Sequence, residues 1–153
     1  EILVEAPWMF LKYLNLDTCS YFIDGKFRTG DVGELRDGYL WITGRKKYLI
    51  NRGGVKISPF MIERIVATTS FFKDFAIIGV PDEIMGEKIV CVYVSDEKGI
   101  SPSNKRTINL KIKEKLGRDF TIDMFVEVPE IPRTTSGKVD IERIKKILAK
   151  MRI

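Results

Sequence analysis

The sequence contains no histidine among its 153 residues. A Ser-His-Asp triad, a histidine general base and most zinc sites are therefore excluded within this chain, because each of them needs an imidazole. We predict no metal site. Any catalytic contribution then has to come from charge and from the positioning of groups.

Cysteine and long apolar runs are also scarce. Cys19 and Cys91 are too few for a disulfide framework, so a reducing, cytoplasmic setting is expected. Cys91 lies in an apolar run and is predicted to be a core residue. No apolar stretch approaches the roughly 20 residues of a transmembrane helix. No secretory signal is visible, and the chain begins at Glu1 without Met, as a fragment of a longer protein would.

The composition that is present suits a folded domain. With 44% hydrophobic and 31% charged residues, the chain is typical of a soluble globular protein. Its length allows one ordinary core, or one domain plus a piece of another. Charge is uneven: residues 101–153 carry a net +6, and the first hundred carry −1. A basic half favours a polyanionic partner, either a nucleic acid or a phosphorylated small molecule.

The first region predicts short strands. A strand over residues 1–6 is ended by Pro7, and Asp24-Gly25 and Asp37-Gly38 are hairpin turn signals. The hairpins pair residues 21–23 with 26–28 and residues 32–35 with 39–42. The apolar stretch from Trp8 to Leu16 is expected to pack against a part of the protein outside this chain. The charged link Gly44-Arg45-Lys46-Lys47 predicts a domain boundary after residue 46.

The second region alternates strands and helices. A hairpin is expected around Arg52-Gly53-Gly54, and strands over residues 75–80, ended by Pro81, and over 89–94 and 125–128. Helices are predicted from Pro59 to about Thr69 with Ser58 as the N-cap, from a cap at Ser103 or Asn104 to Leu116, and after an Asp140 cap. The expected fold class is α+β, with a central sheet of about three strands flanked by helices, plus a β-hairpin.

One loop concentrates hydrogen-bond donors. Pro132-Arg133-Thr134-Thr135-Ser136-Gly137-Lys138 contains three hydroxyl side chains, two cations and no carboxylate. Pro132 fixes one φ angle and Gly137 frees another, which allows a tight loop. Such a loop favours an anion, and Lys138 is a compact charge on a flexible stem. The alternative is a solvated basic turn, and the composition of this loop alone does not decide between the two.

Three stretches in order resemble one family: Phe27-Arg28-Thr29-Gly30-Asp31, then Gly44-Arg45 leading into Gly53-Gly54-Val55-Lys56-Ile57-Ser58-Pro59, then Pro132 to Lys138. Together they resemble the C-terminal part of the adenylate-forming enzymes, which include acyl- and aryl-CoA synthetases, peptide-synthetase adenylation domains and luciferases. The resemblance covers nearly the whole chain. It implies that residues 1–46 are the terminal β segment of a large N-terminal domain whose body is absent, and that residues 47–153 are the small mobile lid domain.

The resemblance implies a two-step reaction. A carboxylic acid attacks the α-phosphate of ATP to give acyl-AMP and pyrophosphate, and a thiol, that of CoA, then attacks the acyl carbon. The implied ligands are ATP, CoA and Mg²⁺, with the metal bound mainly by the absent domain. The chain alone is expected to be inactive, and self-association of the fragment is an expectation for its apolar N-terminal stretch.

The resemblance also assigns roles to single residues. Lys138 is expected to be catalytic, because it matches the lysine that enters the site for adenylation. Asp31 and Arg45 are expected to bind nucleotide, since a carboxylate accepts from ribose hydroxyls and a guanidinium fork suits oxygen pairs. Lys47 falls at the hinge, and Gly53 and Gly54 match a loop that lines the thiol channel.

The sequence departs from the family at three positions: Asn51 and Met61 stand where Lys and Glu are frequent, and Ile141 stands where Arg is common. Each site residue also has a plain alternative, such as a turn cap for Asp31 or a hairpin turn for Gly53-Gly54. Other functions left open are a basic module that binds nucleic acid, a non-catalytic partner-binding fragment, and an adenylation domain that loads a carrier-protein thiol. We expect no nucleic-acid partner, because the aromatic residues lie mostly in apolar runs and no RNP-type or KH-type signature occurs.

Overall fold

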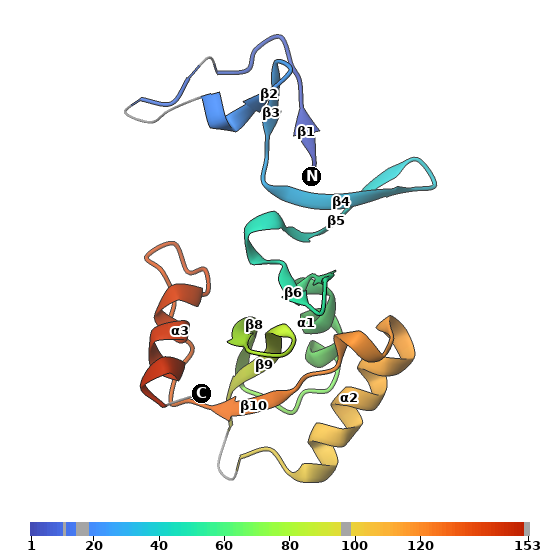
Figure 1. Cartoon of the computed structure of the whole chain (residues 1–153), viewed down its shortest axis with the longest axis vertical. Coiled ribbons are helices and arrows are strands. Elements are labelled where there is room, and N and C mark those ends of the chain that lie inside the picture. Colours follow the sequence, from blue (N-terminus) through green and yellow to red (C-terminus); the bar gives the residue numbers. More distant parts are fainter. Residues whose placement is uncertain (11, 15–18, 96–98, 152–153) are drawn as a thin grey trace. The chain divides into compact units, whose positions relative to one another are not determined.

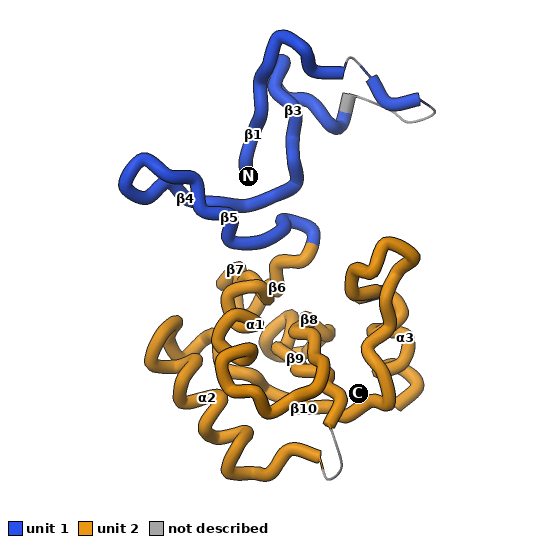
Figure 2. Tube along the Cα trace, turned by 180° about the vertical axis from the view of Figure 1, so that it is seen from behind, with its two compact units in different colours: residues 1–47 blue, residues 48–153 orange. Residues whose placement is uncertain are grey.

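The computed structural model describes residues 1–10, 12–14, 19–95 and 99–151 (Figure 1). The chain divides into two compact units, residues 1–47 and residues 48–153 (Figure 2). The division falls next to the boundary expected after residue 46. None of the helices in the described ranges is long and apolar enough to cross a membrane.

The first unit consists of short antiparallel strands. β1 (Leu3–Val4), β3 (Lys26–Arg28) and β2 (Phe22–Ile23) form one sheet in that order, and the 3₁₀ turn η1 (Cys19–Tyr21) precedes β2. β4 (Asp31–Arg36) and β5 (Tyr39–Arg45) form a separate hairpin. Both predicted hairpins are confirmed. Asp24 and Asp37 have φ angles of 49° and 51° and are each followed by a glycine with positive φ, which is the two-residue turn that Asp-Gly favours.

The first strand is shorter than residues 1–6, because only Leu3 and Val4 pair with the three-residue strand β3. Within the apolar N-terminal stretch, the Phe10 ring packs on those of Tyr13 and Phe27 with centroids 4.7 and 5.1 Å apart. Trp8 remains 85% exposed. Leu11, Asn15 and Leu16 belong to the stretch from Trp8 to Leu16 and lie outside the described residues. Self-association through this stretch stays a prediction.

The second unit is built on a five-stranded sheet. β9 (Gly86–Val94) pairs antiparallel along its length with β8 (Asp74–Asp82) and parallel with β10 (Met124–Glu127). The hairpin of β6 (Ile50–Arg52) and β7 (Val55–Ile57) joins β9 through the pair Arg52 and Gly86. The α+β fold class, with three central strands and a hairpin, is confirmed.

Helices cover both faces of this sheet (Figure 1). α1 (Pro59–Ala67) and α2 (Pro102–Leu116) pack on one face, and α3 (Ile141–Lys150) packs on the other. The 3₁₀ turns η2 (Lys46–Tyr48) and η3 (Arg118–Phe120) lie before β6 and after α2. Ile77 and Cys91 face the α1–α2 side, and Ile78 and Val90 face the α3 side, so both strands are buried on both faces.

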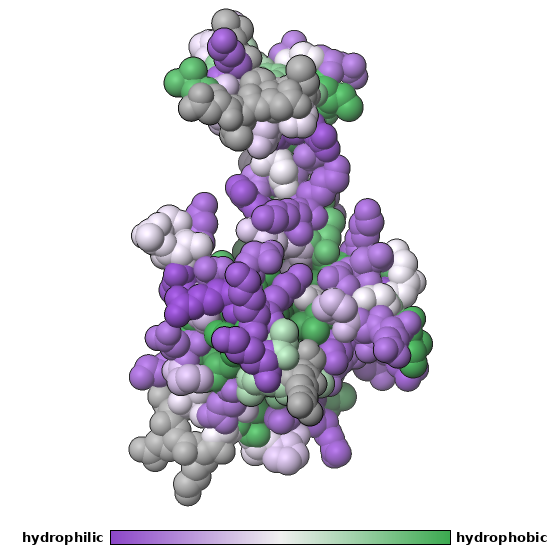
Figure 3. Space-filling view, turned by 60° about the vertical axis from the view of Figure 1, so that its left-hand side comes forward, coloured by the Kyte–Doolittle hydropathy of each residue, from purple (hydrophilic) through white to green (hydrophobic). Residues whose placement is uncertain are grey.

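The apolar side chains are gathered between these layers. The face in Figure 3 is mainly hydrophilic, with small hydrophobic areas. Cys91 is fully buried, which confirms its predicted place in the core, and burial raises the pKa of its thiol well above the ordinary value. The thiol is therefore a packing group.

Two predicted boundaries are wrong. Pro81 does not end β8, which continues to Asp82. The N–H of Ile77 points away from β9 and donates to Glu63. Pro81 is four residues further along β8, so its nitrogen faces the same edge, and proline costs no hydrogen bond to β9 there. The cap of α2 is Ser101, whose Oγ accepts from the N–H of Asn104, because Pro102 is suited to the first helical turn. The caps at Ser58 and Asp140 occupy the predicted positions.

Candidate functional site

The loop that carries Lys138 is closed by its own backbone. The N–H of Thr134 donates to the carbonyl of Lys138 at 2.8 Å, and the N–H of Gly137 donates to the carbonyl of Thr134 at 2.9 Å. Arg133 and Val139 form an isolated β-bridge at the base of the loop. Gly137 has a φ of 79°, a conformation that favours glycine. The loop therefore holds a defined shape, with Lys138 exposed near its end.

Arg133 ties this loop to the sheet. Its Nη2 donates to both carboxylate oxygens of Asp74, at 2.9 and 2.8 Å, and its Nη1 donates to the carbonyl of Gly137 at 3.1 Å. Asp74 is the first residue of β8. The sequence analysis counted Arg133 only as a cation for an anionic ligand and missed this role. The contact spans 59 residues, and no local pattern signals such a pairing.

Gly53 and Gly54 form the turn of the β6–β7 hairpin. Their φ angles are 57° and 86°, as a tight two-residue hairpin turn requires. The N–H of Gly53 donates to the carbonyl of Met85 at 2.8 Å. A Cβ on Gly53 would lie 3.2 Å from the Cε of Met85. A side chain here would strain the turn and crowd Met85, so the bare backbone has a structural basis.

Asp31 and Arg45 lie side by side in the first unit. They are opposite each other in the β4–β5 register, and the Nε of Arg45 is 2.8 Å from Oδ1 of Asp31. The N–H of Asp31 donates to the hydroxyl of Thr29 at 3.0 Å, which fixes the start of the strand. The structure thus brings together the two residues expected to bind nucleotide. The Arg45 side chain is 56% exposed and keeps donors available to a ligand.

Lys47 lies in the 3₁₀ turn η2, directly before the division between the two units. The two loops of the second unit are not brought together. Arg133 is bonded to Asp74 at the start of β8, and Gly53 is bonded to Met85 just beyond the other end of that strand. The nine residues of β8 span about 26 Å. Figures 1 and 2 show the β6–β7 hairpin and the loop before α3 as separate projections.

No metal site is assigned. Within the described ranges, no three His, Cys, Asp or Glu residues are grouped so that they could hold a metal ion.

The chain belongs to the family described as AMP-binding enzyme C-terminal domain, which matches residues 61–138. Its relatives and structural neighbours include acyl- and aryl-CoA ligases of the adenylate-forming superfamily, and the family resemblance seen in the sequence is confirmed. The chain corresponds to the C-terminal part of these proteins.

Individual comparisons agree. The chain is 35% identical to indoleacetate–CoA ligase of Aromatoleum aromaticum, across 98% of this chain and 30% of the relative. It is 36% identical to the mitochondrial malonate–CoA ligase ACSF3 of Homo sapiens, across 92% of this chain and 25% of the relative. Among solved structures, o-succinylbenzoate CoA synthetase of Bacillus subtilis, in complex with its acyl-adenylate intermediate, has a TM-score of 0.82 at 26% identity. That match covers 95% of this chain and 30% of the neighbour. The chain spans less than a third of the length of these proteins.

Proposed function

We propose that this chain is the C-terminal part of an ATP-dependent acyl-CoA synthetase. The whole enzyme activates a carboxylic acid as acyl-AMP and transfers the acyl group to CoA. Residues 1–46 complete the large nucleotide-binding domain, and residues 47–153 form its mobile lid. The proposal is supported by the family match and by relatives named as CoA ligases, which favour CoA over a carrier-protein thiol as the acceptor.

The separation of the two loops is the observation that carries the proposal. The Lys138 loop and the Gly53-Gly54 turn are bonded to residues near opposite ends of β8, about 26 Å apart. A single rigid lid therefore cannot bring both loops to one reaction centre at the same time. A two-step reaction with a lid rotation between the steps gives each loop its own step.

In the first step, a carboxylate oxygen of the acid attacks the α-phosphorus of ATP, and pyrophosphate leaves with the electron pair of the broken P–O bond. Negative charge gathers between the acyl oxygen and the phosphate. The ammonium of Lys138 compensates that charge from a loop whose shape is already set by its backbone. Asp31 accepts from the ribose hydroxyls, and Arg45 donates to nucleotide oxygens.

In the second step, the CoA thiol loses its proton, its thiolate sulfur attacks the acyl carbon, and AMP leaves with the electron pair of the broken C–O bond. The lid has turned about Lys47, so the Gly53-Gly54 turn faces the site and Lys138 faces solvent. The turn lines the path of the thiol, where the absence of side chains leaves room for the slender end of the substrate.

The test is Lys138→Ala in the full-length enzyme. Loss of one preorganised donor costs about 10²–10³ in rate, so ATP–pyrophosphate exchange should fall by about that factor. Thioester formation from preformed acyl-AMP should be largely spared. Lys138→Arg should rescue poorly, because a planar fork does not replace a compact ammonium.

Lys146→Ala is the matched control, since it removes an exposed lysine from α3 with the same change in charge. It should leave both half-reactions near wild type. Exchange by Lys138→Ala at a near wild-type rate would refute the catalytic assignment of Lys138.

A further inference from the structure

The β6–β7 hairpin has few backbone ties to the rest of the sheet. Its strands have three residues each, and the register of β6 on β9 contains the single pair Arg52 and Gly86. Beyond it, the N–H of Gly53 donates to the carbonyl of Met85. A two-stranded hairpin is marginally stable by itself. The orientation of its turn therefore depends on side-chain contacts at its base.

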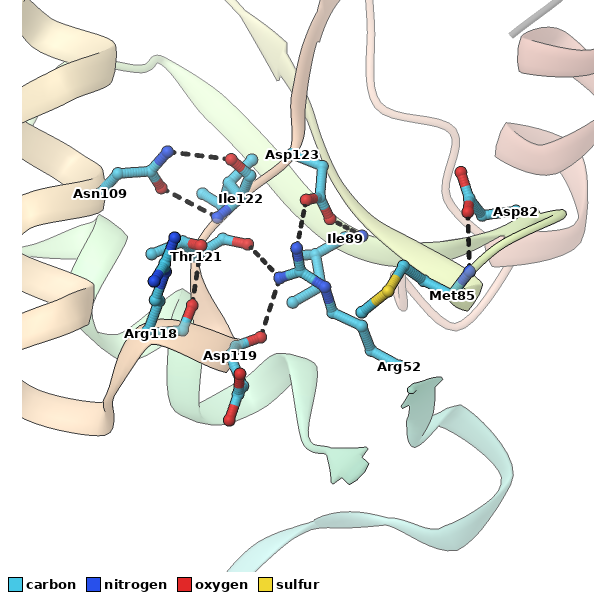
Figure 4. Close-up of polar contacts among 10 residues, drawn as sticks. All are labelled: Arg52, Asp82, Met85, Ile89, Asn109, Arg118, Asp119, Thr121, Ile122 and Asp123. Carbon is cyan, nitrogen blue, oxygen red and sulfur yellow. Dashed lines mark hydrogen bonds and ion pairs between the residues drawn. The ribbon is translucent and has the colours of Figure 1, made fainter. Parts of the chain in front are cut away.

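Arg52, directly before the turn, supplies such contacts (Figure 4). Its Nη1 donates to the carbonyls of Asp119 and Thr121 at 2.9 and 3.0 Å. Its Nη2 is 2.5 Å from Oδ1 of Asp123. The Arg52 side chain is only 15% exposed, so its guanidinium is largely desolvated. Its two terminal nitrogens donate to three acceptors that lie in two directions.

The acceptors of Arg52 are themselves fixed. The other carboxylate oxygen of Asp123 accepts from the N–H of Ile89 in β9 at 2.7 Å. The side-chain amide of Asn109 in α2 donates to the carbonyl of Ile122 and accepts from its N–H, each at 2.9 Å (Figure 4). The segment 119–123, to which Arg52 donates, is thus bonded to the central strand β9 and to α2. The contacts of the Arg52 guanidinium therefore attach the hairpin to a fixed part of the domain.

The far side of the turn is fixed in the same way. Oδ1 of Asp82 accepts from the N–H groups of Ile84 and Met85 at 3.0 and 2.9 Å, and these bonds hold the pKa of Asp82 below its usual range. Met85 in turn accepts from Gly53. The Gly53-Gly54 turn is therefore fixed from two sides. On one side it bonds to Met85, whose turn is held by Asp82, and on the other it follows Arg52, which is paired with Asp123.

We propose that Arg52, through Asp123, is a positioning residue for thioester formation: it fixes the Gly53-Gly54 turn that lines the thiol path. This inference rests on the proposed function. Arg52 itself touches no reacting atom. Its loss leaves the hairpin held to β9 and the β8–β9 turn by the pair with Gly86 and by the N–H bonds of Gly53 to Met85 and of Asn51 to Glu87. The turn is then less firmly fixed along the path of the incoming thiol. The Lys138 loop is bonded to the other end of β8 and does not depend on Arg52.

The experiment compares Arg52→Gln with wild type in the full-length enzyme. Misplacement of a positioning group costs up to about 10² in rate. We therefore expect thioester formation from preformed acyl-AMP to fall by about 10-fold to 10²-fold, with a raised KM for CoA. ATP–pyrophosphate exchange should stay within about twofold of wild type, because adenylation uses the other loop.

Four further variants separate positioning from stability. Arg52→Lys should not restore the rate, because one ammonium cannot reach acceptors in two directions. Asp123→Asn should show a smaller loss of the same kind, and its combination with Arg52→Gln should be no worse than Arg52→Gln alone. Ile144→Val removes a methylene from the core on the opposite face of the sheet. It should lower the melting temperature without changing the ratio of the two half-reactions.

The outcomes are distinguishable. An equal fall of both half-reactions in Arg52→Gln, or unchanged thioester formation, would overturn the role of Arg52. If the wild-type enzyme forms neither acyl-AMP nor a CoA thioester, the proposed function fails and this inference fails with it.

Discussion

Arg133→Gln should separate the activity of the Lys138 loop from the stability of the domain. The substitution removes the two bonds to Asp74 and the bond to the carbonyl of Gly137, while Pro132, Gly137 and the closing backbone bonds of the loop remain. The loop keeps its local shape and loses its tie to the start of β8. On the proposed function, Lys138 then reaches the first reaction centre in a less defined position.

The expected magnitudes differ for stability and rate. The side chains of Arg133 and Asp74 are 46% and 35% exposed, and an exposed ion pair contributes about 0.2–1 kcal/mol to folding. For a domain near 100 residues, the upper value corresponds to a melting-temperature shift of about 4–8 °C. A misplaced catalytic group costs up to about 10² in rate. We therefore expect ATP–pyrophosphate exchange to fall by about tenfold while the domain stays folded.

The assay measures exchange, thioester formation from preformed acyl-AMP, and the melting temperature of the full-length enzyme. Asp74→Asn should produce the same selective loss of exchange, and it keeps the oxygen that accepts from the N–H of Phe75. Arg143→Gln is the matched control, because it removes an exposed arginine from α3 with the same change in charge. Unchanged exchange in both Arg133→Gln and Asp74→Asn, or an equal loss of both half-reactions, would refute this positioning argument.

Two further predictions concern the link and the core. Lys47→Pro should slow thioester formation more than adenylation, because proline restricts φ where the lid is proposed to turn, and equal loss of both measured half-reactions would contradict a hinge there. Glu63 is partly buried, and burial raises the pKa of its carboxyl above its ordinary value of 4.5, an effect that the hydrogen bond from the N–H of Ile77 opposes. The folded state therefore favours the protonated form, and its contribution to stability is present below pH 4.5 and is lost as pH rises through the raised pKa. Glu63→Gln should thus gain free energy of unfolding relative to wild type as pH increases above 4.5, and denaturant unfolding curves with the same pH dependence in both proteins would contradict it.

Local signals predicted most of the secondary structure. Asp-Gly and Gly-Gly pairs predicted the hairpin turns because few residues other than glycine adopt positive φ without strain. The apolar runs around Ile77 and Cys91 predicted strands, and both strands are buried on both faces because each sends alternate side chains to two separate cores. The predicted boundaries were wrong where a residue type suits more than one position in a strand or helix. Pro81 is tolerated on a free strand edge, and Ser101, Ser103 and Asn104 are all good cap residues.

The positioning of the candidate site was much less predictable. Lys138 and the Gly53-Gly54 turn belong to short contiguous motifs, so they could be proposed as site residues from the sequence alone. Arg133 was interpreted only as a cation and Arg52 only as part of a hairpin turn, because their partners Asp74 and Asp123 lie 59 and 71 residues away. The choice of a carboxylate partner for an arginine depends on the tertiary register of the sheet, which no short stretch of sequence encodes.

The two arginine anchors also bear on where motion has to occur. Arg133 ties the Lys138 loop to β8, and Arg52 ties the Gly53-Gly54 turn to the segment 119–123, which is bonded to β9. β8 and β9 are paired along nine residues, so the two anchors belong to one stiff body. Neither loop can then leave its place on the sheet without breaking charge-assisted hydrogen bonds. On the proposed function, exchange between the two loops therefore requires movement of the whole second unit, and the backbone around Lys47, where the two units meet, has to absorb the change in φ and ψ.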